Sequence, residues 1–390
     1  MSESITIMVG TTKGVFLLDS DGERRDWQVR GPLCEGWPTN HLAADPETGA
    51  MWAASGGEWH GAGVWRSLDG GATWDLTLLA NGMFDEMLRN DAGFAAMVGR
   101  GPAADAPFKG QINALWSLGL AHGTLYAGSK PAALFASTDG GVTFAKVQGL
   151  SDHPSSDSWQ PGAAGLVLHS IVSDPGDAGK MWVGISAAGV FATEDGGATW
   201  ERRNRRSNAE TAEPHTHADG SVGDCGHEVG HCVHNIVRAP LATGDLLYQQ
   251  NHHGVFRSAD GGRSWDEITE GLPSTFGFPV AVHPHDPQTL WVLPLNGDSI
   301  GRFPPDASAA VWRSRDGGTT WQAQRQGLPG QNCFFTVLRQ AMATDRAQKA
   351  GVYFGTNSGS VFASRDEGET WSEIARHLPT VLGLEVLHRP

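Results

Sequence analysis

The sequence predicts an all-β protein. Of its 390 residues, 52 are glycine and 15 are tryptophan, and only 18% are charged. That composition is the opposite of the Ala, Glu, Lys and Leu bias that is typical of helical proteins. Short apolar runs recur along the chain between Asp-Gly and Gly-Gly turns, which indicates short strands joined by tight connections. A chain of this length can bury a large core without disulfide bonds.

An eight-residue pattern, Ser/Thr-x-Asp-x-Gly-x-Thr/Ser-aromatic, occurs six times. The copies are Ser67–Trp74, Ser137–Phe144, Thr193–Trp200, Ser258–Trp265, Ser314–Trp321 and Ser364–Trp371. The glycines accept positive φ, the aspartate can accept hydrogen bonds from nearby N–H groups, and the closing aromatic ring can be buried. We therefore expect each copy to close a β-hairpin.

The residues around each copy repeat in register. A small, an aliphatic and an aromatic residue precede each copy, as in residues 63–65 and 189–191, and a further strand with an aromatic residue lies upstream, as in residues 51–52. With another apolar run ahead of that strand, each unit has about four strands. Successive copies are separated by 50 to 70 residues, which is typical of four-stranded propeller blades that carry insertions.

The two ends of the chain complete the pattern. Residues 5–29 have the features of the second, third and fourth strands of a blade, and residues 379–388 those of a first strand. Pairing them closes a ring and removes exposed sheet edges. The prediction is one seven-bladed β-propeller domain over residues 1–390 with six boxes, closed by the C-terminal strand pairing with the N-terminal strands. Residues 202–232 are predicted to be an insertion loop or lid over the channel mouth.

The eight-residue box resembles the Asp-box, or BNR repeat, of sialidases, sortilin-like receptors and xyloglucan hydrolases. The whole chain, and residues 249–287 most clearly, is similar to bacterial BNR-repeat proteins that are often labelled glycosyl hydrolase or sialidase-like. The resemblance implies a propeller fold, and a carbohydrate is one ligand it suggests. Sialidases use a tyrosine nucleophile. Tyr126, Tyr248 and Tyr353 all occupy a repeat position that holds tryptophan in other blades, so we expect them to pack between sheets, which argues against a true sialidase.

The overall charge excludes some partners. The formal net charge is −15 and the pI is near 5.4, so a phosphate backbone or an anionic membrane would be repelled. The first residues lack a basic segment followed by an apolar one, and no apolar run is long enough to span a bilayer. We expect a cytoplasmic protein with neither nucleic-acid nor membrane partners. Whether Cys225 and Cys232 pair with each other or bind a metal is left open.

Residues 227–231 fit HExxH, the pattern of a zinc peptidase helix. The pattern requires a helix, because helical periodicity directs both histidines toward the zinc ion. Gly230 lies inside the string and an apolar strand follows it directly, so the sequence argues against a helix and against a peptidase. As part of the predicted lid, this region can still donate a ligand from above through His215, His217 or His231.

The candidate site lies at the channel mouth away from the boxes, in the loops that enter the first strands and those that join the second and third strands. Predicted catalytic residues are His169, His234, Glu35, Glu58 and Arg302. Predicted substrate-binding residues are Trp37, His60, Asn251, His253, Lys13 and Asn357. Predicted ligands for one divalent transition-metal ion are His41, His169, His234 and His252. His169 and His234 occupy matching positions, whereas His41 aligns only to within one residue, and a one-residue slip reverses the face of a strand.

Histidines and amides dominate this mouth, and histidine transfers protons at neutral pH. The sequence therefore favours a hydrolase or lyase that acts on a small polar or sugar-like molecule. Two alternatives stay open. One is a non-catalytic scaffold for a protein partner, and the other is a glycoside hydrolase with a carboxylate pair. The sequence does not decide the substrate, the metal or the oligomeric state.

Overall fold

The computed structural model describes residues 4–208, 215–216, 222–223, 228–240 and 244–389. The chain is built from antiparallel sheets, so the predicted all-β class is confirmed. The first sheet has the order β3-β2-β1-β30 and consists of β1 (Ser4–Thr11), β2 (Gly14–Asp21), β3 (Gln28–Leu33) and β30 (Val381–Arg389). As the sequence predicts, the C-terminal strand pairs with the N-terminal strand, from Ser4 opposite Arg389 to Thr11 opposite Val381.

The second sheet has eight strands, because two four-stranded groups are linked by one pairing between Gly56 and Ala114. The first group is β4 (Thr39–Ala44), β5 (Met51–Gly57), β6 (Gly61–Ser67) and β7 (Asp75–Asn81). The second group is β8 (Ala114–Ala121), β9 (Thr124–Lys130), β10 (Leu134–Ser137) and β11 (Ala145–Lys146).

Four further sheets each have four strands in chain order. They are β12 (Val167–Ser173), β13 (Met181–Ser186), β14 (Gly189–Thr193) and β15 (Glu201–Arg202); β18 (Val233–Arg238), β19 (Leu247–Asn251), β20 (Gly254–Ser258) and β21 (Asp266–Glu267); β22 (Gly277–Val282), β23 (Leu290–Pro294), β24 (Val311–Ser314) and β25 (Gln322–Gln324); and β26 (Met342–Thr344), β27 (Val352–Gly355), β28 (Val361–Ser364) and β29 (Ser372–Ala375). A separate hairpin joins β16 (His215–Thr216) and β17 (Val222–Gly223).

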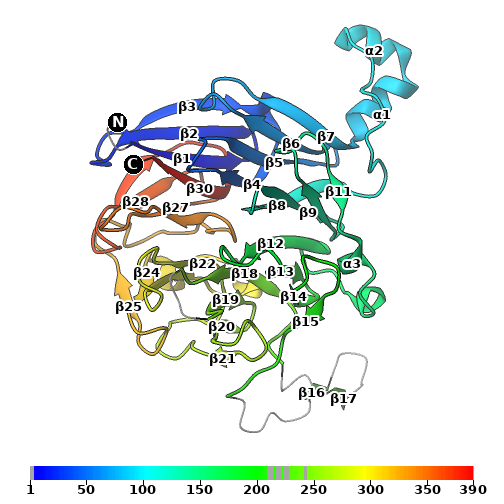
Figure 1. Cartoon of the computed structure of the whole chain (residues 1–390). Coiled ribbons are helices and arrows are strands. Elements are labelled where there is room, and N and C mark those ends of the chain that lie inside the picture. The colour runs from blue at the N-terminus through cyan, green and yellow to red at the C-terminus, as the bar shows by residue number, and fades with distance from the viewer. Residues whose placement is uncertain (1–3, 209–214, 217–221, 224–227, 241–243, 390) are drawn as a thin grey trace.

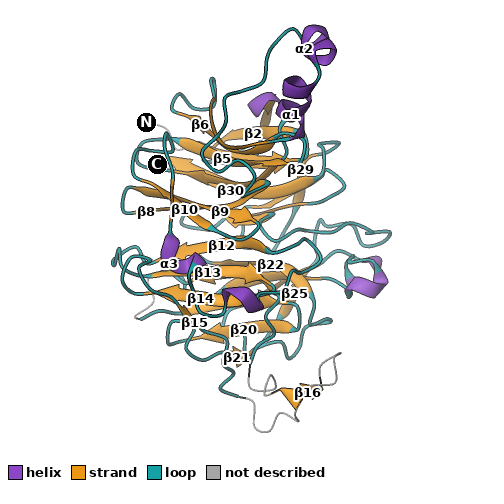
Figure 2. Cartoon of the chain, turned by 90° about the vertical axis from the view of Figure 1, so that its right-hand side faces the viewer, coloured by secondary structure: helices purple, strands orange, loops and turns teal. Residues whose placement is uncertain are grey.

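The first strands of these groups surround a common centre. Each contacts the next in a closed cycle: β30, β4, β8, β12, β18, β22, β26 and again β30. Figures 1 and 2 show the sheets following one another around the molecule, with the two chain ends side by side. This arrangement places the loops that enter the first strands at one end of the ring, where side chains from distant parts of the sequence meet.

The eight-residue boxes have one recurring hydrogen-bond pattern. In the copy that begins at Ser258, the serine hydroxyl donates to Asp260 at 2.8 Å and accepts from the Gly262 N–H at 2.7 Å, while Asp260 accepts from both the N–H and the hydroxyl of Ser264. The same four hydrogen bonds recur in each of the other five copies. The serine or threonine hydroxyl and the aspartate of each box therefore have their partners within the same turn.

Aromatic residues fasten one sheet to the next. Trp52 donates its indole N–H to Gly140 O in the following box, Trp182 donates to Gly261 O, and Trp291 donates to Glu367 O. Tyr248 and Tyr353, at the equivalent position in two other sheets, are fully buried and donate their hydroxyls to Pro287 O and Asp345. These two predicted packing roles are confirmed, and neither hydroxyl is free to act as a nucleophile.

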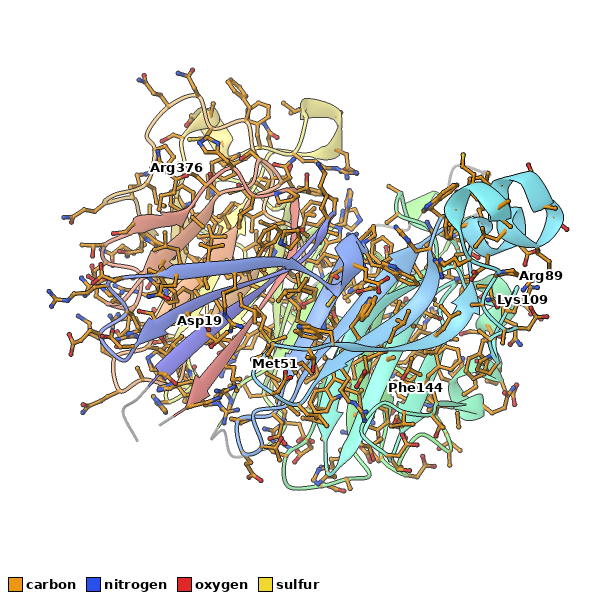
Figure 3. All side chains as sticks on the ribbon, turned by 90° about the horizontal axis from the view of Figure 1, so that it is seen from above. Asp19, Met51, Arg89, Lys109, Phe144 and Arg376 are labelled. Carbon is orange, nitrogen blue, oxygen red and sulfur yellow. The ribbon has the colours of Figure 1, made fainter. Side chains whose placement is uncertain are left out.

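A helical insertion between β7 and β8 was not anticipated from the sequence. It contains α1 (Met83–Asn90) and α2 (Ala92–Val98), which project from the rim of the ring. Glu86, Arg89, Asp105 and Lys109 form ion pairs that hold the insertion together, and Figure 3 shows Arg89 and Lys109 side by side at its base. Shorter helices are α3 (Gln148–Ser151), η1 (Cys34–Gly36), η2 (Ser156–Ser158), η4 (Asp298–Ile300) and η5 (Pro305–Ala307).

No helix in the described part of the chain has the length and apolar character needed to cross a membrane.

Candidate functional site

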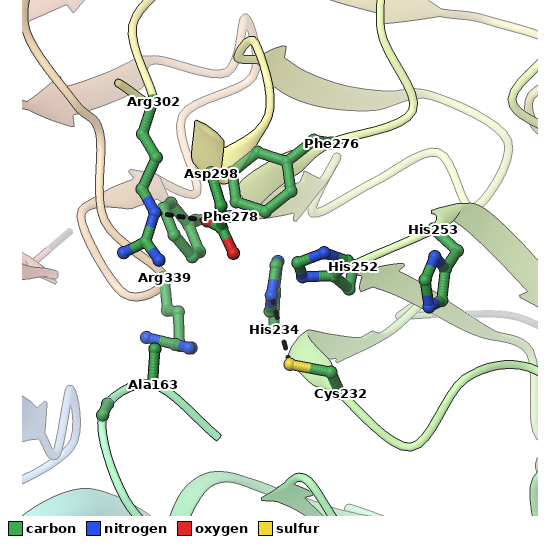
Figure 4. Close-up of a pocket in the computed structure, with 11 residues that line it drawn as sticks. Ala163, Cys232, His234, His252, His253, Phe276, Phe278, Asp298, Arg302 and Arg339 are labelled. Carbon is green, nitrogen blue, oxygen red and sulfur yellow. Dashed lines mark hydrogen bonds and ion pairs between the residues drawn. The ribbon is translucent and has the colours of Figure 1, made fainter. Parts of the chain in front are cut away.

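Some of the predicted site residues line one of two cavities, and the others line neither. The first cavity, of about 380 Å³, is lined by His234, His252 and His253, together with Cys232, Phe276, Phe278, Asp298, Arg302, Arg339, Ala163 and Ala164. Figure 4 shows the cysteine and the histidines on one side of this cavity, and the arginines with Asp298 on the other. We call it the histidine–arginine pocket.

His234 is positioned by a β-bulge in the first strand of its sheet. The register of β18 against β19 shifts between Val233 and Asn235, which leaves His234 on the bulge, and β12 shifts in the same way at His169. Bulges redirect side chains. The predicted equivalence of these two histidines is therefore confirmed. The matching position in β4 is Asn40, so His41 lies one residue beyond it.

His41 and His169, two other predicted metal ligands, lie inside the ring, where both Nδ1 atoms have hydrogen-bond partners and the Nε2 of His169 is buried without one among the described residues. His41 Nδ1 accepts a hydrogen bond from the Leu118 N–H at 2.9 Å, and burial lowers the pKa of His41 to about 4. His169 is fully buried, and its Nδ1 lies 2.9 Å from the Ser170 hydroxyl. Burial and the nearby Arg339 charge hold the pKa of His169 well below its usual range. Of the four predicted metal ligands, the structure brings together only His234 and His252.

His234 is held in one tautomer. Its Nδ1–H donates to Gly277 O, which leaves the Nε2 lone pair facing Cys232 Sγ at 3.6 Å. The ring packs against Phe276 and Phe278, with centroid separations of 5.3 and 4.7 Å. Burial, followed by the Arg339 charge, holds the pKa of His234 well below its usual range, so the ring is neutral at neutral pH.

His252 lies in the tight turn between β19 and β20 and is half-buried. Its backbone N–H donates to Cys232 O at 3.0 Å, so the backbone couples the position of the turn to that of the cysteine. The His252 and His234 rings meet edge to face, 5.5 Å apart. Within the described residues, neither ring nitrogen of His252 makes a hydrogen bond to the protein. The imidazole is therefore open to a ligand.

Two arginines lie on the opposite wall of the pocket, and within the described residues only one of them is in an ion pair. Arg302 forms an ion pair with Asp298. In the described chain Arg339 makes no ion pair, and its Nε is buried without a hydrogen-bond partner. Burial lowers the pKa of Arg339 to about 10, so its guanidinium stays charged at neutral pH. Both guanidinium groups lie over the Phe278 ring, at 5.7 Å for Arg302 and 5.0 Å for Arg339.

The second cavity, of about 330 Å³, lies beside the helical insertion. It is lined by Glu35, Trp37, Trp59, His60, Leu76, Leu78, Phe84, Asp85, Arg100 and Ala103, and we call it the aromatic cleft. The Trp37 and His60 rings stack with centroids 4.8 Å apart, and burial lowers the pKa of His60. The structure thus places Glu35, Trp37 and His60 away from the histidine–arginine pocket.

The remaining predicted residues line neither cavity. Glu58 is exposed in the turn between β5 and β6, and Lys13 is exposed in the turn between β1 and β2. Asn251 is fully buried and donates to Gly230 O and Gln249. Asn357 accepts from the Thr336 N–H at 2.7 Å. The two asparagines hold neighbouring loops in place.

Part of the predicted lid lies outside the described residues, including His217, Cys225 and His227, and the side chain of His215 is likewise outside the description. The HExxH string can be followed only from Glu228. No helix forms between residues 228 and 232, and His231 Nε2 is hydrogen-bonded to the Glu228 carboxylate at 2.7 Å. Cys232 is a free thiol.

Three residues that line the histidine–arginine pocket are absent from the predicted site residues: Cys232, Arg339 and Phe278. The sequence leaves open whether Cys232 pairs with Cys225 or binds a metal. Arg339, like Arg302, lies outside the repeat positions, and that is the sequence signal that distinguishes it from the other arginines. Phe278 belongs to the string "FGFP" at the start of β22. The available signal for Cys232 was its place two residues before His234, because alternate residues of a strand share a face.

The structure therefore defines an all-β protein with a polar pocket among the loops that enter its first strands. No family model matches the chain. An oligoxyloglucan-reducing end-specific xyloglucanase of Emericella nidulans is 24% identical over 217 residues, which cover 51% of this chain and 25% of that protein. The chain matches between 18% and 27% of the length of its curated relatives.

Solved structures agree on the fold. An ancestral GH74 enzyme superposes with a TM-score of 0.54 and 17% identity, covering 83% of this chain and 36% of that one. Apo AztD from Citrobacter koseri superposes with a TM-score of 0.56 and 10% identity, covering 99% and 98%. These likenesses identify a β-propeller type of architecture and nothing finer.

Proposed function

We propose that this chain is a seven-bladed β-propeller with six Asp-boxes, and that its histidine–arginine pocket is the active site of a hydrolase or lyase. The proposed substrate is a small polar or sugar-like molecule that carries an acidic group. The observation that carries this proposal is Arg339, a charged guanidinium that lines the pocket without an ion pair in the described chain.

A half-buried guanidinium without an ion pair is costly, and the nearby Asp298 and contact with one aromatic ring offset only part of that cost. An anionic substrate group, or negative charge that develops during the reaction, would supply the missing partner. His252 lies across the same pocket with both ring nitrogens open, which suits proton transfer to or from a bound molecule. Phe276 and Phe278 limit access of water to this region and strengthen both interactions.

The test is turnover of a panel of p-nitrophenyl esters, phosphates and glycosides and of small lactones. We expect at least one probe class to be turned over, and expect Arg339→Met and His252→Gln each to lower kcat/KM by about 100-fold. The matched controls Arg25→Met and His377→Gln, both at exposed positions, should leave turnover unchanged. Turnover of no probe, or turnover that survives both pocket substitutions, would reject the proposal.

The aromatic cleft supports a second candidate, a glycoside hydrolase. Glu35 and Asp85 line it together with the rings of Trp37 and Trp59, and such hydrolysis commonly uses two carboxylates. The xyloglucanase names of the distant relatives agree with this class. Release of reducing sugar from xyloglucan oligosaccharides, abolished by Glu35→Gln and retained by Glu47→Gln, would support it. Inactivity of the wild type on these oligosaccharides would exclude it.

A non-catalytic scaffold is the third candidate. Trp59, Met83, Met87 and Met97 are exposed apolar side chains on or beside the helical insertion, and exposed apolar clusters can mark protein-binding surfaces. A stoichiometric partner that is lost when Met83 and Met97 are both changed to Ser would favour this function, provided that no small molecule is turned over. Turnover on the panel would reject it as the main role.

A further inference from the structure

We propose that Cys232, His234 and His252 bind one divalent transition-metal ion, with zinc as the best match to their chemistry. Binding can be tested without turnover, so the inference goes beyond the proposed function, and only the use of the ion in a reaction rests on that function. The three donor atoms, one from each side chain, all lie within 4.8 Å of one another.

The distances suit a tetrahedral ion. A thiolate sulfur at 2.3 Å and an imidazole nitrogen at 2.1 Å from one tetrahedral centre are about 3.6 Å apart. The separation of Cys232 Sγ and His234 Nε2 is 3.6 Å. The His252 donor lies within 4.8 Å of the other two, so it must move by about 1 Å to reach the separations of a tetrahedral site. A thiolate and two imidazoles are a donor set that zinc and similar borderline-soft ions prefer.

The groups around the ligands are arranged as in metal sites. The Nδ1–H of His234 donates to the Gly277 carbonyl, and a metal-binding histidine usually donates its other ring N–H in this way, which fixes the ring and its tautomer. The hydrogen bond from the His252 N–H to Cys232 O joins the other two ligands through the backbone. Phe276 packs against both histidine rings, with centroids at 5.3 and 5.1 Å.

A catalytic cysteine–histidine pair is the main competing explanation for the contact between Cys232 and His234. Such a pair requires one imidazole beside the sulfur, whereas here a second imidazole, from another loop of the same sheet, lies beside the same sulfur. Ser186, 3.7 Å from the sulfur, also lies at the edge of the group. Convergence of a third donor is explained by an ion and is not required by a thiol nucleophile.

The charges around the site set what else binds there. Three protein ligands leave a four-coordinate ion with one position for water or substrate. The Cys232 thiolate and Asp298 offset part of the positive charge of the ion, Arg302 and Arg339. The remaining positive charge favours an anion as the fourth ligand, which agrees with the acidic substrate group proposed above.

The experiment is titration of untagged, chelator-treated protein with Co²⁺, followed by competition with Zn²⁺. We expect one equivalent of Co²⁺ to bind and to produce the near-ultraviolet charge-transfer absorption of a cobalt–thiolate bond. Cys232→Ser should remove that absorption, and His252→Gln should weaken Co²⁺ binding by at least about 10-fold. The matched controls are Cys333→Ser and His377→Gln, which lie outside the pocket and should bind as the wild type does. Circular dichroism of every variant establishes that it is folded.

Failure to bind Co²⁺ or Zn²⁺, or binding that is unaffected by Cys232→Ser and His252→Gln, would overturn the metal site. Loss of the charge-transfer band in Cys232→Ser with unchanged affinity in His252→Gln would overturn the three-ligand arrangement. Metal binding without turnover of any probe would support the site and reject the proposed enzyme. Turnover by a protein that binds neither Co²⁺ nor Zn²⁺ would do the reverse.

Discussion

The two ends of the ring differ in how they treat polar side chains. At the end with the boxes, each serine or threonine and each aspartate has partners inside its own turn, as Ser258 and Asp260 do. At the other end, His252 and Arg339 face a cavity without such partners. Polar groups that are hydrogen-bonded within the protein stabilise the fold, whereas the side chains of His252 and Arg339 are available to bind a ligand. The repeated residues thus explain the architecture, and the residues that break the repeat carry the chemistry.

The largest loss of stability is expected when a fully buried box tryptophan is replaced. Trp265 is fully buried and donates its indole N–H to Arg203 O at 3.0 Å. Trp265→Ala should lower the free energy of unfolding by about 3–5 kcal/mol. Trp74 occupies the same box position but is only half-buried. Trp74→Ala should therefore lower the free energy of unfolding by clearly less. Urea denaturation measures both, and equal losses would mean that burial does not distinguish the boxes.

Two arginines, Arg313 buried and Arg339 half-buried, test the comparison directly. Arg313, near the boxes, is bound by Glu369 at 2.7 Å and by Glu367 O at 2.8 Å, whereas Arg339 has no ion pair in the described chain. Arg313→Met should cost about 2 kcal/mol of stability because it leaves acceptors without a partner. Arg339→Met should leave stability unchanged or higher, because it removes a half-buried charge that has no ion pair in the described chain. A destabilised Arg339→Met variant would show that this guanidinium is structural.

A third prediction concerns the cavity at the opposite end of the first strands. That cavity, of about 520 Å³, is lined by Glu385 with Arg238, Arg346, His285, His388 and Asp345 among others. Burial raises the pKa of Glu385 to about 7, against the opposing effect of the Arg346 charge.

The folded state therefore holds a proton on Glu385 that the unfolded state has lost above its ordinary pKa near 4.5. Stability falls as the pH rises from about 4.5 to 7, and it stays reduced above 7. Glu385→Gln should match the wild type near pH 4.5 and exceed it by about 2 kcal/mol at pH 8. Urea midpoints at the two pH values measure this, and a constant difference between the proteins would contradict it.

The smallest loss of stability is expected when a single box hydroxyl is removed. Ser258→Ala removes a donor to Asp260 and an acceptor for the Gly262 N–H, which should cost about 1 kcal/mol. Burial raises the pKa of Asp260, but the hydrogen bonds from Ser264 and Ser258 outweigh it, so the pKa lies below its ordinary value. The box contribution is therefore present above the ordinary aspartate pKa and is lost as the pH falls through the lowered one. A thermal melt at pH 7 and at pH 3 should show a smaller Ser258→Ala difference at the lower pH.

The sequence predicted the fold well because a box is a local object. Its turn, its carboxylate and its aromatic ring lie within eight residues. The residues that form the hydrogen bonds of the turn are therefore all visible in one short stretch of sequence. The site was predicted less well because its parts come from separate loops. A bulge that no residue type marks decides that Asn40, and not His41, corresponds to His234. The helices at residues 83–98 were missed because they interrupt the repeat, although Asp91 caps α2 by accepting from the Phe94 N–H.

The pairing of β30 with β1 constrains how the protein is made. Ser4 and Arg389 are partners although 385 positions separate them in the sequence, so this contact of the ring cannot form until β30 has left the ribosome. Pairings between such distant residues form slowly, because the entropy of closing the loop is lost before the contact is gained. Until then β1 exposes an open edge that can pair with another molecule. Nascent or truncated chains are therefore the species most prone to aggregate.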